Sequence, residues 1–404
     1  MHNAWVFLFI YKLRPLCFNV SGLVKKYDVI VLGVGSMGAS ACYQLSKKGL
    51  KVLGIEKHTI PHDKGSYTGK TRIFRKAYFE SKDYVPLLNR TYKNWIELES
   101  EHQEKLLEFT GLLYAGLPDS EVLKGVKNSS KAYNIPIKQL THIEVKTLYP
   151  QFNIPEDFNV LFEQDAGFIY ADRAVELLSN KAIASGAEIH ENEQFMRWEK
   201  SRDGYLVVTT DCGTYFCDKL VFCTGSWSHK LIDTLNLDIT KQILYWAKVK
   251  NEQDYELGKF PCWIIDEPTI EGSFYGFPVI NDSKDELLNQ LKFGHHVKGA
   301  LIDPENYSQA VNNEVANPTV AMIADYFSKF TYTSMQTRSC MYSNSMDSDF
   351  YVDFLDHEKR VVLAAGFSGH GFKFVPVIGE IITSLITKGS TPFNIEFLSL
   401  SRHY

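Results

Sequence analysis

The chain has 404 residues, and its 43 Lys and Arg against 48 Asp and Glu give a formal net charge of −5 at pH 7. At roughly 100–200 residues per domain, this length predicts two or three domains, which can bury a core without disulfide or metal staples. Ordinary Gly and Pro usage excludes collagen and low-complexity disorder, and an acidic chain without runs of Lys or Arg argues against nucleic-acid binding and favours a small-molecule partner.

Residues 1–26 are expected to form an extension outside the fold. The apolar stretch Trp5–Tyr11 is cut short by Lys12 and Arg14, whereas a membrane helix needs about 20 apolar residues. A signal peptide carries its positive charge before the apolar run, so the segment has only weak signal-like character. No later segment is long enough to span a bilayer, and no membrane partner is expected.

A βαβ unit is predicted next. In chain order it consists of a strand at Asp28–Leu32, a GxGxxG turn at Gly33–Gly38, a helix at Ala39–Lys48 and a second strand at Lys51–Glu56. Gly33 permits the tight turn, Gly35 lets the backbone approach a pyrophosphate, and Gly38 lets helix and strand pack closely. Glu56 ends the second strand, where an acid accepts hydrogen bonds from a ribose. The unit predicts a dinucleotide site; a glycine-rich turn without a ligand is the structural alternative.

Similar elements recur in the middle and at the end of the chain. They are a helix at Asp172–Ser185, strands at Glu188–His190 and Lys219–Cys223, a hairpin of Leu206–Thr210 with Tyr215–Cys217, a strand at Val361–Ala365, a glycine loop at Gly366–Gly371 and a helix at Val375–Lys388. The stretches between them are richer in alternating and aromatic patterns. We therefore expect two interleaved domains: 27–106, 164–243 and 338–404 form the nucleotide-binding domain, and 107–163 and 244–337 form an α+β substrate domain with a mixed sheet.

The seven cysteines are scattered along the chain. None forms a CxxC pair and no Cys/His cluster has the spacing of zinc ligands, so no metal site is expected. Most free cysteines are small buried hydrophobes, and a reducing compartment is the plain interpretation.

Three further segments carry motifs, and two of the three are long and specific. Gly65–Tyr78 (GSYTGKTRIFRKAY), Ser339–Tyr342 (SCMY) and Gly366–Phe374 (GFSGHGFKF) resemble the flavin-and-substrate loop, the flavin attachment segment and the C-terminal signature of the monomeric sarcosine oxidase family. That family of FAD-dependent amine oxidases has N-methyltryptophan oxidase and pipecolate oxidase as relatives. The likeness extends from Tyr27 to Arg402. It implies an α/β fold in which a Rossmann-like domain of the glutathione reductase type binds FAD rather than NAD.

The resemblance also implies how the cofactor is held. A thioether would join Cys340 to the 8α position of the flavin, which fixes the cofactor permanently and raises its potential. The residues implied to contact FAD are Gly33, Gly35, Ser36, Met37, Gly38, Glu56, Ser66, Thr71, Arg72, Cys340, Gly369, Gly371 and Lys373.

The family's substrates, secondary amino acids, carry a carboxylate beside the reacting C–N bond. Arg matches a carboxylate in two hydrogen bonds and Lys supports it as a point charge, and the resemblance places Arg75 and Lys373 in these roles. Three further residues match the family's active site, namely Tyr275, Tyr342 and His296. The neighbouring His295 is expected to face the other way.

Arg72 and Lys292 carry the electrostatics that the resemblance implies for catalysis. Arg72 would lie beside the flavin ring, where a cation tunes its electronics, and Lys292 near flavin N5. A fixed positive charge there would stabilise superoxide as it forms, which makes an oxidase rather than a dehydrogenase. One departure is that Tyr67-Thr68 replaces the paired histidines of sarcosine oxidases, which affects the expected pH profile and preferred amine.

The implied activity is oxidation of sarcosine or a similar N-methyl amino acid, by hydride transfer to FAD, hydrolysis of the imine and reoxidation by O₂ to give H₂O₂. The alternatives are a pipecolate or N-methyltryptophan oxidase and a flavin amine dehydrogenase with an acceptor other than O₂. An NAD-dependent reductase and an FAD-binding protein without turnover fit the motifs less well. A monomer is expected, and because Ser401–Tyr404 lacks an SKL-like address we expect a cytoplasmic enzyme, with the peroxisome as the alternative in a eukaryote.

Overall fold

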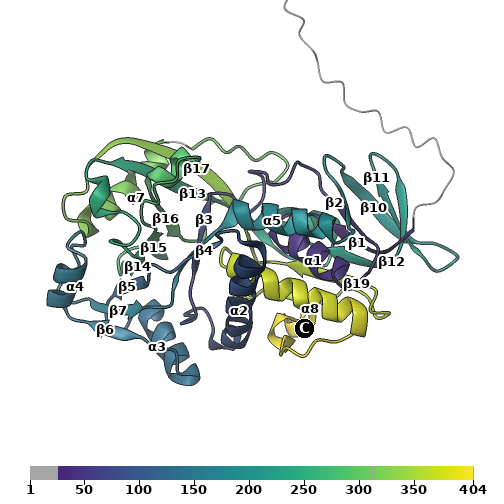
Figure 1. Cartoon of the computed structure of the whole chain (residues 1–404), viewed down its shortest axis with the longest axis horizontal. Coiled ribbons are helices and arrows are strands. Elements are labelled where there is room, and N and C mark those ends of the chain that lie inside the picture. Colours follow the sequence, from purple (N-terminus) through teal and green to yellow (C-terminus); the bar gives the residue numbers. More distant parts are fainter. Residues whose placement is uncertain (1–25, 312, 404) are drawn as a thin grey trace, which may run out of the picture.

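The structure is a computed structural model that describes residues 26–311 and 313–403. Two eight-stranded sheets form two lobes, and a three-stranded sheet lies between them (Figure 1). The expected extension lies outside the described residues except for Lys26, which begins the first strand. Among the described residues, no helix combines the length and apolar composition needed to cross a bilayer.

The first sheet carries the predicted βαβ unit. Its strands are β1 (Lys26–Leu32), β2 (Val52–Ile55), β9 (Glu188–His190), β10 (Phe195–Lys200), β11 (Leu206–Thr210), β12 (Thr214–Phe222), β18 (Tyr351–Phe354) and β19 (Val361–Ala365). Strand β1 pairs in parallel with β2 and β12. The two strands expected at 215–217 and 219–223 are one strand, β12, because the ladder to β1 continues past Asp218 to Lys219 opposite Val29. The other predicted strands of this sheet are confirmed.

Four long helices pack beside this sheet and the centre of the molecule (Figure 1). They are α1 (Ser36–Ser46), α2 (Val85–His102), α5 (Ala171–Ala184) and α8 (Val375–Lys388). Helix α8 has the predicted bounds, with Pro376 in its first turn and Gly389 in the left-handed conformation after its end. Helix α1 begins three residues before its predicted start, because the helix already opens within the glycine turn. A Cβ on Gly379 would lie 2.2 Å from Ser40 Oγ, so α1 and α8 approach closely.

The second sheet forms the other lobe. Its strands are β5 (Leu112–Gly116), β6 (Lys138–Leu140), β7 (Asn159–Glu163), β13 (Asp238–Val249), β14 (Cys262–Asp266), β15 (Ser273–Gly276), β16 (Leu291–His296) and β17 (Tyr332–Asn344). Helices α3 (Glu121–Tyr133), α4 (His142–Leu148) and α7 (Asn313–Tyr326) lie in the same lobe (Figure 1). The small central sheet contains β3 (Thr71–Phe74), β4 (Leu107–Glu108) and β8 (Gly167–Tyr170). The expected domain boundaries at 243/244 and 337/338 fall inside the paired strands β13 and β17, and that division stays a prediction.

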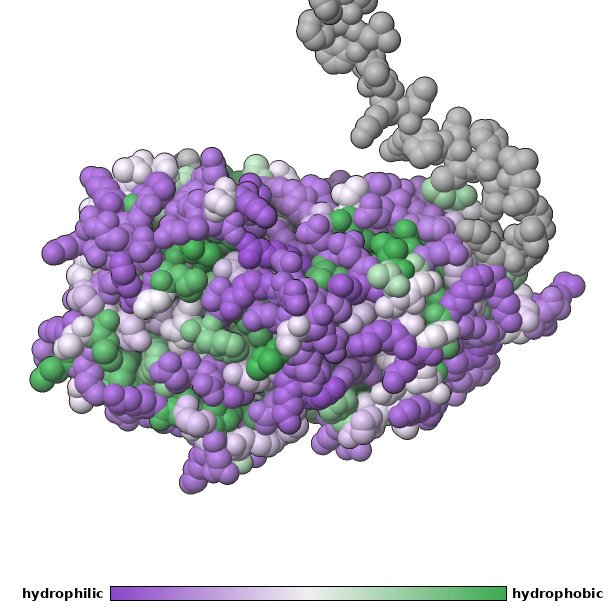
Figure 2. All heavy atoms as spheres, viewed as in Figure 1, coloured by the Kyte–Doolittle hydropathy of each residue, from purple (hydrophilic) through white to green (hydrophobic). Residues whose placement is uncertain are grey.

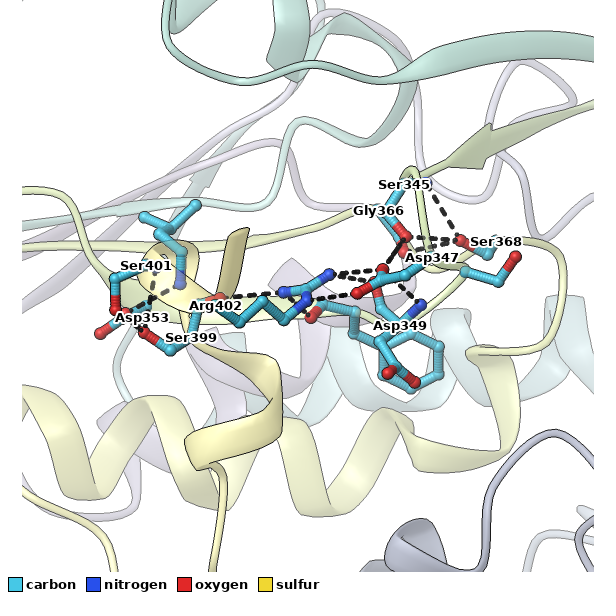
Figure 3. A network of polar contacts seen from close by, with 12 residues as sticks. Ser345, Asp347, Asp349, Asp353, Gly366, Ser368, Ser399, Ser401 and Arg402 are labelled. Carbon is cyan, nitrogen blue, oxygen red and sulfur yellow. Dashed lines mark hydrogen bonds and ion pairs between the residues drawn. The ribbon is translucent and has the colours of Figure 1, made fainter. Parts of the chain in front are cut away.

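The C-terminal turn ties the last part of the chain to the second glycine loop (Figure 3). The guanidinium of Arg402 donates to both carboxylate oxygens of Asp347, at 2.7 and 2.9 Å, and to the carbonyls of Asp349 and Phe350. Ser345 N in turn donates to Ser368 Oγ at 3.2 Å. On the face drawn in Figure 2, polar side chains predominate and apolar groups are scattered among them.

Candidate functional site

Two neighbouring cavities share part of their lining. The larger, named here the outer cleft, has about 1400 Å³ of empty space, and the smaller, named the inner cavity, about 670 Å³; both volumes include space open to solvent. Arg72, Tyr342, Gly369 and Phe372 line both, so the two spaces meet at these residues. The predicted residues that line the outer cleft are Gly33, Gly35, Ser36, Met37, Glu56, Ser66, Arg72, Tyr342, Gly369 and Gly371. Those that line the inner cavity are Arg72, Arg75, Tyr275, His296, Cys340, Tyr342, Gly369 and Lys373.

The first glycine turn forms one wall of the outer cleft. Gly33 has φ +80°, and a Cβ there would lie 2.6 Å from the Cys223 carbonyl oxygen. A Cβ on Gly38 would lie 1.8 Å from the Gly33 carbonyl oxygen. Protein packing therefore requires both glycines. A Cβ on Gly35 would meet nothing closer than the Tyr67 ring, at 3.6 Å, so its absence leaves free space at the N-terminus of α1, where backbone N–H groups bind phosphate.

Glu56 lies at the end of β2 and is buried in the wall of the cleft. Its carboxylate accepts from Val34 N at 2.8 Å and from His58 N at 3.0 Å, and His62 Nε2 lies 3.5 Å from Oε1. Burial by itself would raise the pKa of Glu56, but His62 and the backbone N–H groups outweigh it and lower that pKa. An ionised carboxylate thus faces the cleft, as the recognition of ribose hydroxyls requires.

Two hydroxyl groups show that the outer cleft is built for a polar ligand. Ser226 Oγ and Ser343 Oγ belong to residues that line the cleft, and both are buried without a hydrogen-bond partner among the described residues. Buried hydroxyls are normally hydrogen-bonded. Together with the room beside Gly35 and the carboxylate of Glu56, these groups fit a dinucleotide such as FAD.

At one end of the inner cavity, Arg75 is already paired with a carboxylate. Its Nη2 lies 2.6 Å from both Oε1 and Oε2 of Glu80, and its Nη1 donates to the Ala77 carbonyl at 3.3 Å. Burial alone would raise the pKa of Glu80, but Arg75 outweighs it and lowers that pKa to about 2. Glu80 was missed from the sequence; an acid five residues after Arg75 in the same loop is the signal that could have found it.

Lys373 supplies the second cation at this end. Its ammonium donates to the His370 carbonyl at 2.7 Å. Burial and the positive charge of Arg75 lower the pKa of Lys373 to about 7. Because Arg72 also lines the cavity and Glu80 is its one acidic lining residue in the described part of the chain, the cavity is positive and suits an anion.

Tyr275, Tyr342 and His296 form an aromatic part of the wall of the inner cavity. His296 Nδ1 lies 3.2 Å from the Tyr342 hydroxyl. Burial lowers the pKa of His296 to about 4, so its ring is neutral, and burial raises the pKa of Tyr275 to about 12. His295 faces away, as expected: its Nε2 bonds to the Glu271 carbonyl at 2.8 Å.

Arg72 lines both cavities, and Cys340 lines the inner one. Cys340 is a buried free cysteine in β17, and burial raises the pKa of its thiol. The Arg72 guanidinium donates to the carbonyls of Thr71 at 2.8 Å, Ser66 at 2.9 Å and Thr68. These bonds fix a permanent positive charge at the junction.

Three predicted residues line neither cavity: Gly38, Thr71 and Lys292. Gly38 is needed for packing. Lys292 is buried, and its Nζ bonds to the Gly69 carbonyl at 2.6 Å, the Thr71 carbonyl at 2.7 Å and Thr71 Oγ1 at 3.1 Å. An ammonium has three N–H donors, so the described contacts occupy all of them. Burial and the charge of Arg72 lower the pKa of Lys292.

The outer cleft has the features of a dinucleotide-binding site: a glycine turn at a helix N-terminus, an acid at the end of the second strand, and two hydroxyls without a partner among the described residues. Residues 28–385 match the family model for FAD-dependent oxidoreductases of the DAO type, so the chain belongs to this family. This confirms FAD as the cofactor and the oxidoreductase class expected from the sequence.

Two curated relatives cover most of the chain. Monomeric sarcosine oxidase of Bacillus sp. (strain B-0618) is 33% identical over 93% of this chain and 96% of its own length. N-methyl-L-tryptophan oxidase of Yersinia pestis (strain Pestoides F) is 32% identical over 93% of this chain and 99% of its own. The solved structure of NikD, an amino acid oxidase of nikkomycin biosynthesis, superposes with a TM-score of 0.79 at 22% identity, over 93% of this chain and 97% of that one. The expected family and fold class are confirmed.

Proposed function

We propose that the protein oxidises a secondary amino acid, sarcosine or a similar N-methyl amino acid, with FAD as cofactor and O₂ as the final acceptor, giving an imine that water hydrolyses and H₂O₂. One observation carries the proposal: buried Arg75 and Lys373 line the inner cavity, which meets the outer cleft at Arg72 and Tyr342. The names of the two curated relatives support the same substrate class.

In this proposal the cofactor occupies the outer cleft and supplies a two-electron acceptor next to the inner cavity. The turn at Gly35 and the N-terminus of α1 hold the pyrophosphate, and Glu56 holds the ribose. Ser226 and Ser343 offer hydroxyls that have no hydrogen-bond partner within the described part of the chain. Cys340 is the attachment point, through its sulfur to the flavin 8α carbon.

Arg75 and Lys373 bind the carboxylate of the substrate. Because Glu80 already holds the Arg75 guanidinium at 2.6 Å, the incoming carboxylate shares or displaces this partner, and Lys373 adds charge from the other side. The wall of Tyr275, Tyr342 and His296 positions the amine. The positive charge and burial of the cavity lower the pKa of the bound ammonium, which favours the neutral amine that reacts.

Arg72 and Lys292 are proposed to provide positive charge for the reaction with O₂. A flavin amine dehydrogenase with another acceptor is the second candidate, and one observation favours it: the three N–H donors of Lys292 are occupied by Gly69 and Thr71.

Pipecolate and N-methyltryptophan are the alternative substrates, and Thr68 in place of the family histidine affects the pH profile. The domain division at 107–163 and 244–337, a monomeric state and a cytoplasmic location (peroxisomal in a eukaryote) belong to the same proposal.

A peroxide assay tests it. Purified holoenzyme is given sarcosine, pipecolate and N-methyltryptophan, together with dimethylamine, piperidine and N-methyltryptamine, which lack the carboxylate. Peroxide is expected from at least one amino acid and not from its decarboxylated partner. Arg75→Lys should lose activity at low substrate, whereas Arg90→Lys, which alters a two-bond Arg–Glu pair with Glu380 outside the cavities, should retain it. Substrate-dependent flavin bleaching without peroxide in air would select the dehydrogenase, and inert flavin with every compound would refute both.

A further inference from the structure

The aromatic ring of Tyr78 lies against both cations of the inner cavity. Its centroid is 4.4 Å from Arg75 Cζ and 5.0 Å from Lys373 Nζ. Tyr78 is fully buried and is not among the residues that line the cavity. It therefore contacts the two groups that face a ligand without facing the ligand itself.

The hydroxyl of Tyr78 is fixed by His370. The two groups form a hydrogen bond between the Tyr78 oxygen and His370 Nδ1. The other nitrogen of the imidazole ring, His370 Nε2, lies 3.0 Å from the Ser348 carbonyl oxygen. A carbonyl can only accept, so Nε2 carries the proton, and the neutral ring leaves Nδ1 as an acceptor. Burial lowers the pKa of His370 to about 3, so the Tyr78 hydroxyl donates in this bond across the neutral pH range.

Packing restricts the ring further. Tyr84 and Phe374 lie 5.3 and 5.6 Å from it, centroid to centroid, and Ser129 Oγ donates to the Tyr78 carbonyl. The Ser348 carbonyl that fixes His370 belongs to the loop held by Arg402 (Figure 3). The ring thus has one orientation, which is set by His370 and by the aromatic side chains packed around it.

This arrangement has an electrostatic consequence. Arg75 and Lys373 repel each other: the positive charge of Arg75 lowers the pKa of Lys373, and both cations lower the pKa of Glu80. The electron-rich face of an aromatic ring attracts cations, most strongly where water is excluded. A ring that contacts two buried cations supports both without taking up any of their N–H donors.

We infer that Tyr78, fixed by His370, is a positioning residue that holds Arg75 and Lys373 ready for the carboxylate of the substrate. The inference rests on the proposed function, because it takes these two cations to be the carboxylate site. It adds a residue that touches neither substrate nor cofactor.

The test measures binding without turnover. Propionate has the carboxylate but no amine, and propionamide is its uncharged counterpart. Each is titrated into holoenzyme and followed by the change in flavin absorbance. The variants are Tyr78→Met, which removes the ring, and Tyr78→Phe, which removes only the hydroxyl. Tyr84→Met and Tyr84→Phe are matched controls, since Tyr84 belongs to the same aromatic cluster and its hydroxyl accepts from Phe350 N at 3.0 Å.

Wild-type protein should bind propionate more tightly than propionamide. Loss of a desolvated cation–ring contact should weaken propionate binding by about tenfold in Tyr78→Met, and loss of one hydrogen bond by about threefold in Tyr78→Phe. Propionamide binding should stay unchanged. The Tyr84 variants should lower the melting temperature by a similar amount and keep the wild-type preference.

A propionate preference in Tyr78→Met equal to that in Tyr84→Met overturns the inference. If Tyr78→Met does not fold, Tyr78→Phe against Tyr84→Phe decides by the same comparison. A wild-type protein that does not distinguish propionate from propionamide refutes the carboxylate site itself, which is a failure of the proposed function and not of the role of Tyr78.

Discussion

The affinity of the inner cavity for a carboxylate should fall steeply between pH 7 and pH 9 because Lys373 loses its proton there. Burial and the nearby Arg75 lower the pKa of Lys373 to about 7. The other shifted groups that line the cavity titrate outside this interval: the pKa is about 2 for Glu80, about 4 for His296 and about 3 for His370. Lys373 therefore dominates the pH dependence expected from the cavity wall.

The magnitude follows from the protonated fraction. With a pKa of about 7, that fraction falls from about one half at pH 7 to about one hundredth at pH 9, a change of about fiftyfold. Propionate affinity, measured by flavin absorbance at constant ionic strength, should fall by about the same factor, because bound carboxylate holds the proton on Lys373. Below pH 6 the affinity should reach a plateau.

Two variants separate this cause from others. Lys373→Met should bind propionate with the weak affinity that wild type shows at high pH, and with little dependence on pH. Lys373→Arg should also show little dependence on pH, because the guanidinium keeps its charge. A wild-type affinity that is constant from pH 6 to pH 9, or a decline that survives in Lys373→Met, would refute the reasoning.

Three further predictions concern the cofactor, oxygen and the C-terminus. Gly35→Ala should keep the melting temperature of the apoprotein but weaken FAD binding at least tenfold. Gly38→Ala should instead destabilise the fold by about 1–3 kcal/mol, since its Cβ would lie 1.8 Å from a carbonyl oxygen. Equal melting temperatures of the two variant apoproteins would contradict this prediction. Lys292→Met should slow reoxidation by O₂ in stopped-flow experiments far more than anaerobic reduction by substrate, and equal slowing of both would exclude the proposed role. Arg402→Lys should lower the free energy of unfolding by about 1–3 kcal/mol, because the Arg402 fork bonds to Asp347 and to backbone carbonyls; unchanged urea midpoints would contradict it.

The sequence predicts the nucleotide-binding half of the fold well because local signals determine it. The apolar strand, the glycine turn and the acid of the βαβ unit all lie between Asp28 and Glu56, and the structure has these elements within a few residues of their expected bounds. Where Asp218 interrupts an apolar run, the sequence predicts a break. The ladder between β1 and β12 overrides it, because pairing with an already buried strand outweighs one polar residue.

The inner cavity depends on contacts that no local pattern carries. Arg75 and Lys373 are almost 300 residues apart in the chain, and they are brought together only because β3 and the second glycine loop meet between the lobes. The motifs of a known family predicted this pair, but not the partner Glu80 or the ring of Tyr78. Likewise, the sequence placed Lys292 by resemblance alone, and its bonds to the segment at Gly69 emerge only from the fold.

The central proposal is that FAD occupies the outer cleft and is joined covalently to Cys340. Whether the flavin stays with the protein after denaturation tests this proposal most directly. Wild-type protein expressed with ample riboflavin should be yellow and should keep its flavin fluorescence on an SDS gel. Cys223→Ser is the matched control, because Cys223 is also buried and lines the outer cleft, and it should keep the fluorescent band. Cys340→Ser should lose the band while its native form still binds FAD. Flavin that stays with denatured Cys340→Ser, or colourless wild-type protein, would contradict the assignment.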